Sequence, residues 1–167
     1  MGVYQAEYIW IDGYEPLGNL RSKTKMVEEG KEPPIWGFDG SSTKQAPGEA
    51  SDCVLNPVLV TPDPLRGGNN KLVLCEVLLT DMSAHPSNSR ARTRALAEQF
   101  AAHEPMFGLE QEYTFFEDQL PLGWPERGFP APQGRYYCGV GAEYVFGRDI
   151  VEEHMRACID AGLSISG

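Results

Sequence analysis

Residues 71–79 are almost continuously Leu and Val, and this stretch limits the possible folds more than any other. A short apolar run bounded by turn signals is typical of a buried strand. The turn signal before it is Gly-Gly-Asn-Asn at residues 67–70. We therefore expect a central strand at 71–79, in which Glu76 is the one polar residue that needs an explanation.

Further strands are expected on either side in sequence. Residues 3–12 alternate, are rich in Tyr, Ile and Trp, and lead into a turn at Gly13. A short apolar segment follows at 35–38, and another strand is expected at 53–61. Asn-Pro at 56–57 interrupts the latter, so it should lie at a sheet edge or contain a bulge.

Residues 20–27 have a period of two, which fits an antiparallel strand with one solvated side. Arg21, Lys23 and Lys25 share one face of this strand. These cations could form a phosphate-binding stripe, but a solvated strand face is the favoured interpretation.

Residues 106–116 also have the aromatic and β-branched content of a strand. On a strand Glu110 and Glu112 point to the same side, with Cα atoms about 6 to 7 Å apart. This spacing suits two neighbouring cations, and Mg²⁺ or Mn²⁺ prefer such oxygen ligands. The alternative is a solvated strand face, against which the bulky apolar neighbours argue.

After residues 85–88, taken as a domain linker, a helix is expected at about 90–102 with Ser87 or Ser89 as its cap. Leu96 and Phe100 are expected on its inner face, and Arg90, Arg92 and Arg94 on its outer side. A second helix is expected at 148–161, ended by Gly162, with a strand beginning at 163–165. Because an unfinished strand leaves a raw sheet edge, we expect the chain to be an N-terminal fragment of a longer enzyme.

The composition limits the classes of partner. The net charge is -10, and hydrophobic residues make up 41% of the chain. An acidic chain is unsuited to nucleic acid or an anionic membrane surface, and no long apolar run is present. We expect a soluble, cytoplasmic protein with no nucleic-acid or membrane partner. The four cysteines have no CxxC spacing, so neither a zinc site nor a disulfide framework is favoured.

The segment 38–43, Phe-Asp-Gly-Ser-Ser-Thr, is the last local feature. A Gly followed by hydroxyl residues can turn tightly and offer N–H groups to an anion. Taken alone, Asp39 is an ordinary turn-initiating aspartate.

Several segments together, in this order, resemble glutamine synthetase of the shorter class found in eukaryotes and some soil bacteria. They are residues 8–13, 36–43, 70–77, 108–114, 123–125, 132–134, 136–142 and 147–151.

The resemblance implies an α+β chain. It implies an N-terminal β-grasp domain over residues 3–82 and the incomplete first part of a catalytic domain over 89–167. It also implies ATP-dependent ligation of ammonium to L-glutamate through γ-glutamyl phosphate, with Mg²⁺ or Mn²⁺ as cofactor and ATP as co-substrate. The family forms rings of identical subunits in which adjacent subunits share active sites.

The resemblance also implies roles for single residues. Glu110 is similar to a ligand of the cation that accompanies the ATP phosphates, and Glu112 to a ligand of the cation that organises glutamate. Asp39 resembles an aspartate that reaches into the neighbouring subunit's site, binds ammonium and takes its proton. Tyr137 resembles an aromatic residue that lines the same pocket. Arg135 departs from the family, which has a small residue or proline there.

Two alternatives from the sequence stay open. A close relative in reaction class would be a glutamate–amine ligase, although Asp39 and Tyr137 favour ammonium. A different class would be a non-catalytic interaction module, or truncated subunit, that associates with a full-length synthetase. Because the family's remaining metal, glutamate and phosphate ligands fall beyond residue 167, the chain alone is expected to be inactive.

Overall fold

The structure is a computed structural model, and it describes residues 2–129 and 138–166. The chain divides into two compact units. The first is Met1–Pro105 with Asp160–Gly162, and the second is Met106–Ile159 with Leu163–Gly167.

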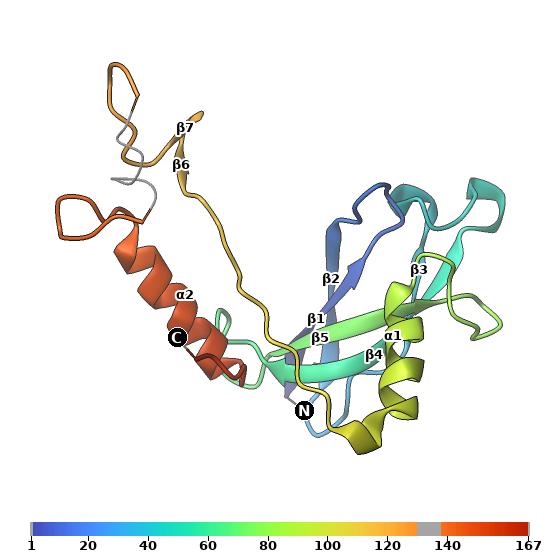
Figure 1. Ribbon diagram of the computed structural model, residues 1–167. Helices are drawn as coiled ribbons and strands as arrows, with labels where there is room; N and C mark the ends of the chain where they lie inside the picture. Colours follow the sequence, from blue (N-terminus) through green and yellow to red (C-terminus); the bar gives the residue numbers. More distant parts are fainter. Residues whose placement is uncertain (1, 130–137, 167) are drawn as a thin grey trace. The chain divides into compact units, whose positions relative to one another are not determined.

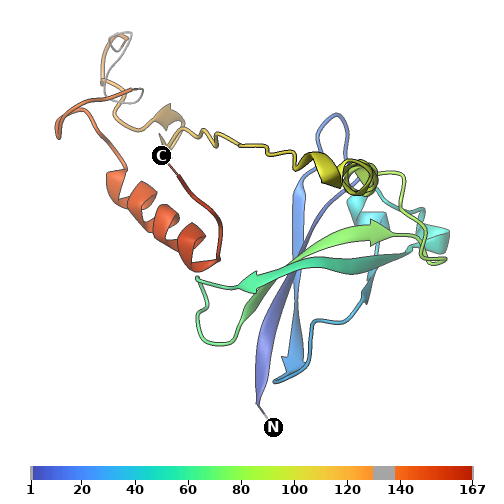
Figure 2. The ribbon, with the colours of Figure 1, turned by 60° about the horizontal axis from the view of Figure 1, so that its bottom comes forward.

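The first unit is built on one mixed sheet of five strands in the order β2-β1-β5-β4-β3 (Figure 1). The strands are β1 (Val3–Ile11), β2 (Leu20–Glu28), β3 (Trp36–Asp39), β4 (Asp52–Pro62) and β5 (Lys71–Leu78). Only the β1–β5 pair is parallel, and the other neighbours are antiparallel. The sheet is strongly twisted, so that β4 and β5 cross β1 and β2 at a steep angle (Figure 2).

The predicted central strand is confirmed, because β5 lies in the middle of the sheet. The expected irregularity at residues 56–57 is confirmed as a register shift between Pro57 and Leu59, so β4 is bulged and does not lie at an edge. A bulge accommodates a residue that cannot donate to the ladder.

The core lies on one face of this sheet. Its largest members from β1 are Tyr4, Tyr8 and Trp10, which are at most 7% exposed. The other strands add Val27, Phe38, Cys53, Leu55, Val73, Cys75 and Val77. The alternation that predicted strand 3–12 therefore marks a core face, as the period of two requires.

The interpretation of the β2 cations as a solvated face is wrong. Lys23 pairs across the ladder with Tyr8, so the cations lie on the core side. Lys23 Nζ is 3.6 Å and Lys25 Nζ 4.6 Å from the centroid of the Trp36 ring. Burial, and then the charge of Lys25, lower the pKa of Lys23. The sequence pattern could not reveal this arrangement because lysine stems cover apolar surface as readily as apolar side chains do.

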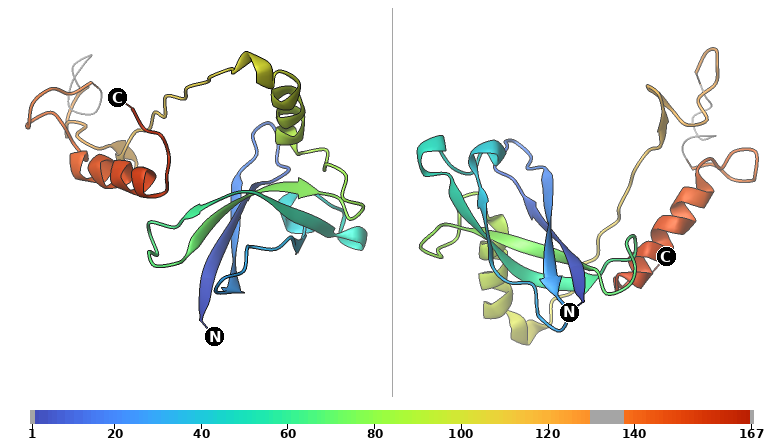
Figure 3. Two further views of the ribbon diagram at one scale, coloured as in Figure 1. Left: turned by 90° about the horizontal axis from the view of Figure 1, so that it is seen from below. Right: turned by 180° about the vertical axis from the view of Figure 1, so that it is seen from behind.

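Helix α1 (Ser89–Gln99) follows β5 and lies along the other face of the sheet (Figure 3). Its cap is Asn88, which accepts a hydrogen bond from the Ala91 N–H, rather than the predicted Ser87 or Ser89. The predicted faces of the helix are also wrong. Leu96 and Phe100 are exposed, whereas two of the arginines form ion pairs with Glu76 of β5.

The helix ends before its predicted limit at residue 102. A short 3-10 turn, η3 (Ala101–His103), follows it, and Glu104 takes a left-handed conformation with φ of 47°. The predicted domains 3–82 and 89–167 remain predictions, although α1 belongs to the first compact unit here.

The second unit contains the strands β6 (Phe116–Glu117) and β7 (Leu120–Pro121), which pair as a hairpin, and all but the last residue of helix α2 (Arg148–Asp160). The predicted second helix is confirmed to within one residue, and Gly162 follows it with φ of 84°. The strand predicted at 163–165 is absent from the described part of the chain, which ends at 166.

The predicted strand at 106–116 is likewise wrong, because residues 106–115 form no strand and only residue 116 belongs to one. A strand is held by a ladder of hydrogen bonds to a neighbour. Among the described residues, the backbone bond from the Leu122 N–H to the Phe115 carbonyl at 2.8 Å touches only the end of this segment, and no strand pairs along it. Aromatic and β-branched content favours an extended backbone but does not supply the ladder.

Candidate functional site

Asp39 is the last residue of β3, which places it at the mouth of the loop 40–50. Its neighbour across the ladder is Asp52, the first residue of β4. Asp39 is exposed, so its carboxylate is accessible from solvent.

Two hydrogen bonds from one residue fix the Asp39 carboxylate. Asp39 Oδ1 accepts the Ser41 hydroxyl at 2.6 Å and the Ser41 N–H at 2.9 Å. These bonds hold the pKa of Asp39 below its ordinary value, with the hydroxyl contributing most. The carboxylate is therefore charged at neutral pH and can attract a cation.

The turn after Asp39 closes around the carbonyl of Gly40. The Gly40 oxygen accepts the N–H groups of Thr43, Gln45 and Ala46 at 3.2, 2.9 and 3.2 Å. A Cβ added to Gly40 would lie 2.7 Å from the Cys53 sulfur, closer than packing permits. The glycine predicted to allow a tight turn is thus required here by a close approach.

The polar side chains of Gln45 and His85 were not identified from the sequence. Both are buried, at 5% and 8% exposed. An isolated polar residue in a loop has no periodic signal, so only the folded structure reveals the partners that bury it.

Glu110 and Glu112, the predicted metal ligands, lie in the segment without strand structure, and both are exposed. Their carboxylates suit Mg²⁺ or Mn²⁺ chemically. However, no group of three or more His, Cys, Asp or Glu that could hold a metal ion occurs among the described residues.

Tyr137 and Arg135 lie outside the described residues. The role of Tyr137 and the effect of Arg135 therefore stay predictions from the sequence. Cys138, the first residue described after them, is exposed and not in a disulfide.

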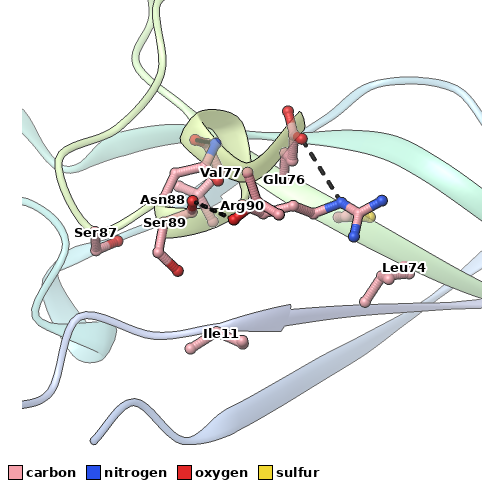
Figure 4. A pocket seen from close by; sticks show the side chains of 10 residues that line it. Ile11, Leu74, Glu76, Val77, Ser87, Asn88, Ser89 and Arg90 are labelled. Carbon is pink, nitrogen blue, oxygen red and sulfur yellow. Dashed lines mark hydrogen bonds and ion pairs between the residues drawn. The ribbon is translucent and has the colours of Figure 1, made fainter. Parts of the chain in front are cut away.

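A cavity of about 280 Å³ lies between β5 and the start of α1 (Figure 4). Glu76 lines it with a fully buried side chain, and its oxygens lie 3.7 Å from Arg90 Nε and 3.2 Å from Arg94 Nη1. Among the described residues, no group forms a hydrogen bond with either oxygen. The polar residue of the predicted central strand is therefore explained, because two arginines of α1 form ion pairs with the buried Glu76 carboxylate.

Comparison with known proteins defines the class. Residues 2–80 match the family model described as "Glutamine synthetase, beta-Grasp domain". The five-stranded mixed sheet that carries Asp39 is accordingly a β-grasp domain.

Whole-chain comparison extends the match. Proteins named glutamine synthetase from Frankia alni and Streptomyces viridochromogenes are 65% and 62% identical over 98% of this chain. A protein named "Glutamine synthetase 2 cytoplasmic" from Drosophila melanogaster is 49% identical over 99%. The chain belongs to the glutamine synthetase family. It spans about half the length of these relatives, at 46%, 49% and 46%.

Within residues 2–129 and 138–166, no helix has both the length and the apolar character needed to cross a bilayer.

Proposed function

We propose that this chain provides the β-grasp part of a glutamine synthetase active site, in an enzyme that ligates ammonium to L-glutamate at the expense of ATP. The observation that carries the proposal is the 62–65% identity over 98% of the chain to proteins named glutamine synthetase. The exposed Asp39 carboxylate, fixed by Ser41, supports it from the geometry.

The reaction has two steps. The γ-carboxylate of glutamate attacks the γ-phosphate of ATP, which forms γ-glutamyl phosphate and releases ADP; ammonia then displaces phosphate. Ammonium must lose a proton before its nitrogen lone pair can attack. A negatively charged group that binds ammonium therefore has to stand near the acyl phosphate.

We assign this role to Asp39. Its lowered pKa keeps the carboxylate charged and so favours attraction of ammonium. The same lowered pKa makes it a weaker proton acceptor than an ordinary carboxylate, so its first contribution is to bind and orient the cation. Tyr137 is proposed to line the same pocket.

Divalent cations neutralise phosphate charge in reactions of this kind. Glu110 is proposed as a ligand of the cation that accompanies ATP, and Glu112 as a ligand of the cation near glutamate, each as part of a larger ligand set. Because two carboxylates rarely hold a catalytic metal cluster unaided, the 167-residue chain alone is expected to be inactive.

Assembly and location are also proposals. We infer a homo-oligomeric ring in which Asp39 serves the active site of an adjacent subunit, and a cytoplasmic location. The word "cytoplasmic" in the name of the Drosophila relative supports the latter.

A split-enzyme assay tests the proposed function. The chain is co-expressed with a polypeptide that supplies the remaining half of the Frankia alni relative, and γ-glutamyl hydroxamate formation is measured. We expect activity only when both halves are present. Soluble, co-purifying halves without activity would refute the proposal, and activity of the 167-residue chain alone would refute its predicted inactivity.

The same assay separates the alternatives. Replacing ammonium by small amines distinguishes a glutamate–amine ligase, which would prefer the amine. The interaction-module hypothesis requires no catalysis by the chain. It predicts that the chain binds a full-length synthetase during size-exclusion chromatography and changes its activity.

A further inference from the structure

We propose that His85 is a positioning residue for Asp39, and that it acts through Gln45 on the turn that follows Asp39. The inference rests on the proposed function for the role of Asp39 in binding ammonium. The hydrogen bonds around His85 and the NMR test do not depend on that role. His85 lies 46 positions from Asp39 in sequence, in the segment between β5 and α1.

The imidazole ring of His85 is held at both nitrogens. Nε2 lies 2.5 Å from the carbonyl oxygen of Gln45, and Nδ1 accepts the Ser87 N–H at 3.1 Å. A carbonyl only accepts, so Nε2 has to carry the proton, and Nδ1 has to be the acceptor. The geometry therefore assigns His85 to the neutral Nε2–H tautomer.

The side chain of Gln45 anchors the same loop at a second point. Its Nε2 donates to the Ile11 carbonyl at 3.1 Å and to the Ser87 hydroxyl at 3.0 Å. Its Oε1 accepts the indole N–H of Trp10 at 3.3 Å. Both ends of Gln45 are thus tied to the edge of the core and to the segment that carries His85.

The connection to Asp39 runs through the backbone. Gln45 N–H donates to the Gly40 carbonyl at 2.9 Å, and Gly40 N–H donates to the Ser51 carbonyl at 2.7 Å. Gly40 directly follows Asp39, and Ser41, which fixes the Asp39 carboxylate, comes next. Loss of the His85 contact would leave the Gln45 carbonyl with only the weak Cys53 thiol donor at 3.8 Å, and would loosen the loop at Gln45.

This arrangement gives a structural role to a buried histidine that has no assigned contact with a metal or substrate. Among the described residues the hydrogen-bond partners of its ring are the Gln45 carbonyl and the N–H and hydroxyl of Ser87. An apolar residue at this position could fill the same space, but it could not donate a hydrogen bond to the Gln45 carbonyl. The histidine is therefore suited to fixing a loop whose position matters.

The test compares the whole chain with His85→Ala and His85→Gln, because the Gln amide can still donate toward the Gln45 carbonyl. The readout is the pH midpoint of the Asp39 titration, measured by NMR from the chemical shift of its carboxyl carbon. We expect the midpoint to rise toward the ordinary aspartate value in His85→Ala and to stay low in His85→Gln. Asp63, in the turn between β4 and β5, also has a lowered pKa and serves as the internal control.

Three results would overturn the proposal. The Asp39 midpoint could stay unchanged in a folded His85→Ala chain. The Asp63 midpoint could move together with that of Asp39, which would indicate general loosening. Nitrogen NMR of the wild-type chain could place the proton on Nδ1 of His85.

If His85→Ala does not fold, Ser87→Ala takes its place. This change keeps the ring but removes the hydroxyl that contacts His85 Nδ1 at 2.9 Å and Gln45 Nε2 at 3.0 Å. A smaller rise of the Asp39 midpoint supports the proposal, and no rise contradicts it. Since none of these measurements involves catalysis, failure of the proposed function would be seen separately, in the split-enzyme assay.

Discussion

Arg94 Nη1 lies 3.2 Å from Glu76 Oε2, so a guanidinium from α1 sits over a carboxylate that is fully buried in the central strand. Arg90 approaches the other oxygen at 3.7 Å. A charge removed from water needs a partner, and here the partner belongs to the next element of the chain. This relationship makes the docking of α1 dependent on electrostatics, because its apolar residues Leu96 and Phe100 are exposed.

Replacing Arg94 by Met should lower the free energy of unfolding by about 1–3 kcal/mol, because the Glu76 carboxylate would lose its nearest cation. Urea denaturation measures the change. Arg92→Met is the matched control on the same helix, since Arg92 is exposed and forms no ion pair within the described residues. In a Glu76→Leu background the Arg94 change should cost much less. Equal costs in both backgrounds would contradict the pairing.

Gly40→Ala should destabilise the chain by about 1–3 kcal/mol, since its new methyl group would lie 2.7 Å from the Cys53 sulfur and 3.2 Å from Ala46 Cβ. The backbone at Gly40 has φ of -77°, so the cost comes from packing and not from a left-handed conformation. Gly48→Ala in the same loop is the control, because no atom lies within 4 Å of its added Cβ. Thermal melting compares the two. A Gly40→Ala protein as stable as Gly48→Ala would show that the loop yields without cost.

The strands of the first unit were predictable because alternation and apolar runs report directly on burial. The sequence placed β5 centrally and located the irregularity in β4 correctly. It could not assign the faces of β2 or α1, because Lys23 and Arg94 bury their stems and pair their charges within the fold. An analysis of hydrophobic periodicity treats every lysine and arginine as solvent-exposed, so it assigned these faces to solvent.

In the candidate site, too, the sequence identified some residues and missed others. Asp39 was identified through its resemblance to a family motif, but the local pattern alone described an ordinary turn. The residues that hold the turn, Gln45 and His85, gave no signal because their partners are 40 residues apart in sequence. For Glu110 and Glu112 the strand prediction failed since a strand depends on a neighbour that local sequence does not encode.

Asp12 should make the free energy of unfolding depend on pH below about pH 4. Burial raises the pKa of its carboxyl, but hydrogen bonds from the backbone of Asn19 and Tyr14 and from the Arg21 side chain outweigh burial and lower it to about 2. A folded-state pKa below the ordinary 3.8 contributes stability above pH 4 that is lost as the pH falls toward 2. The contribution is about 2 kcal/mol.

Urea denaturation of the wild-type chain and Asp12→Asn across this range measures the contribution. The difference between the two should be full at pH 6 and shrink steadily between pH 4 and 2. Glu49→Gln, an exposed residue, controls for general charge effects. A difference that is constant over the whole range would mean that the Asp12 charge contributes nothing.

Asp39→Asn should lower synthetase activity in the split-enzyme assay by about 100-fold or more, because the carboxylate proposed to bind ammonium would become neutral. Asp81→Asn is a close match, since Asp81 Oδ1 accepts the Ser83 hydroxyl and N–H at the same 2.6 and 2.9 Å. Asp81 should be dispensable. Similar losses in both variants would attribute the effect to turn stability instead of ammonium binding.

The pair Glu110 and Glu112 should bind Mn²⁺ only weakly in the 167-residue chain, because the rest of a ligand shell is missing from the described residues. Calorimetric titration with Mn²⁺ should give small heats that do not saturate at one ion per chain. Glu110→Ala should reduce these heats, whereas Glu126→Ala, another exposed glutamate of the same unit, should leave them unchanged. Tight, stoichiometric binding that disappears in Glu110→Ala would show that two carboxylates suffice, and the expectation that the chain alone is inactive would then lose its main physical argument.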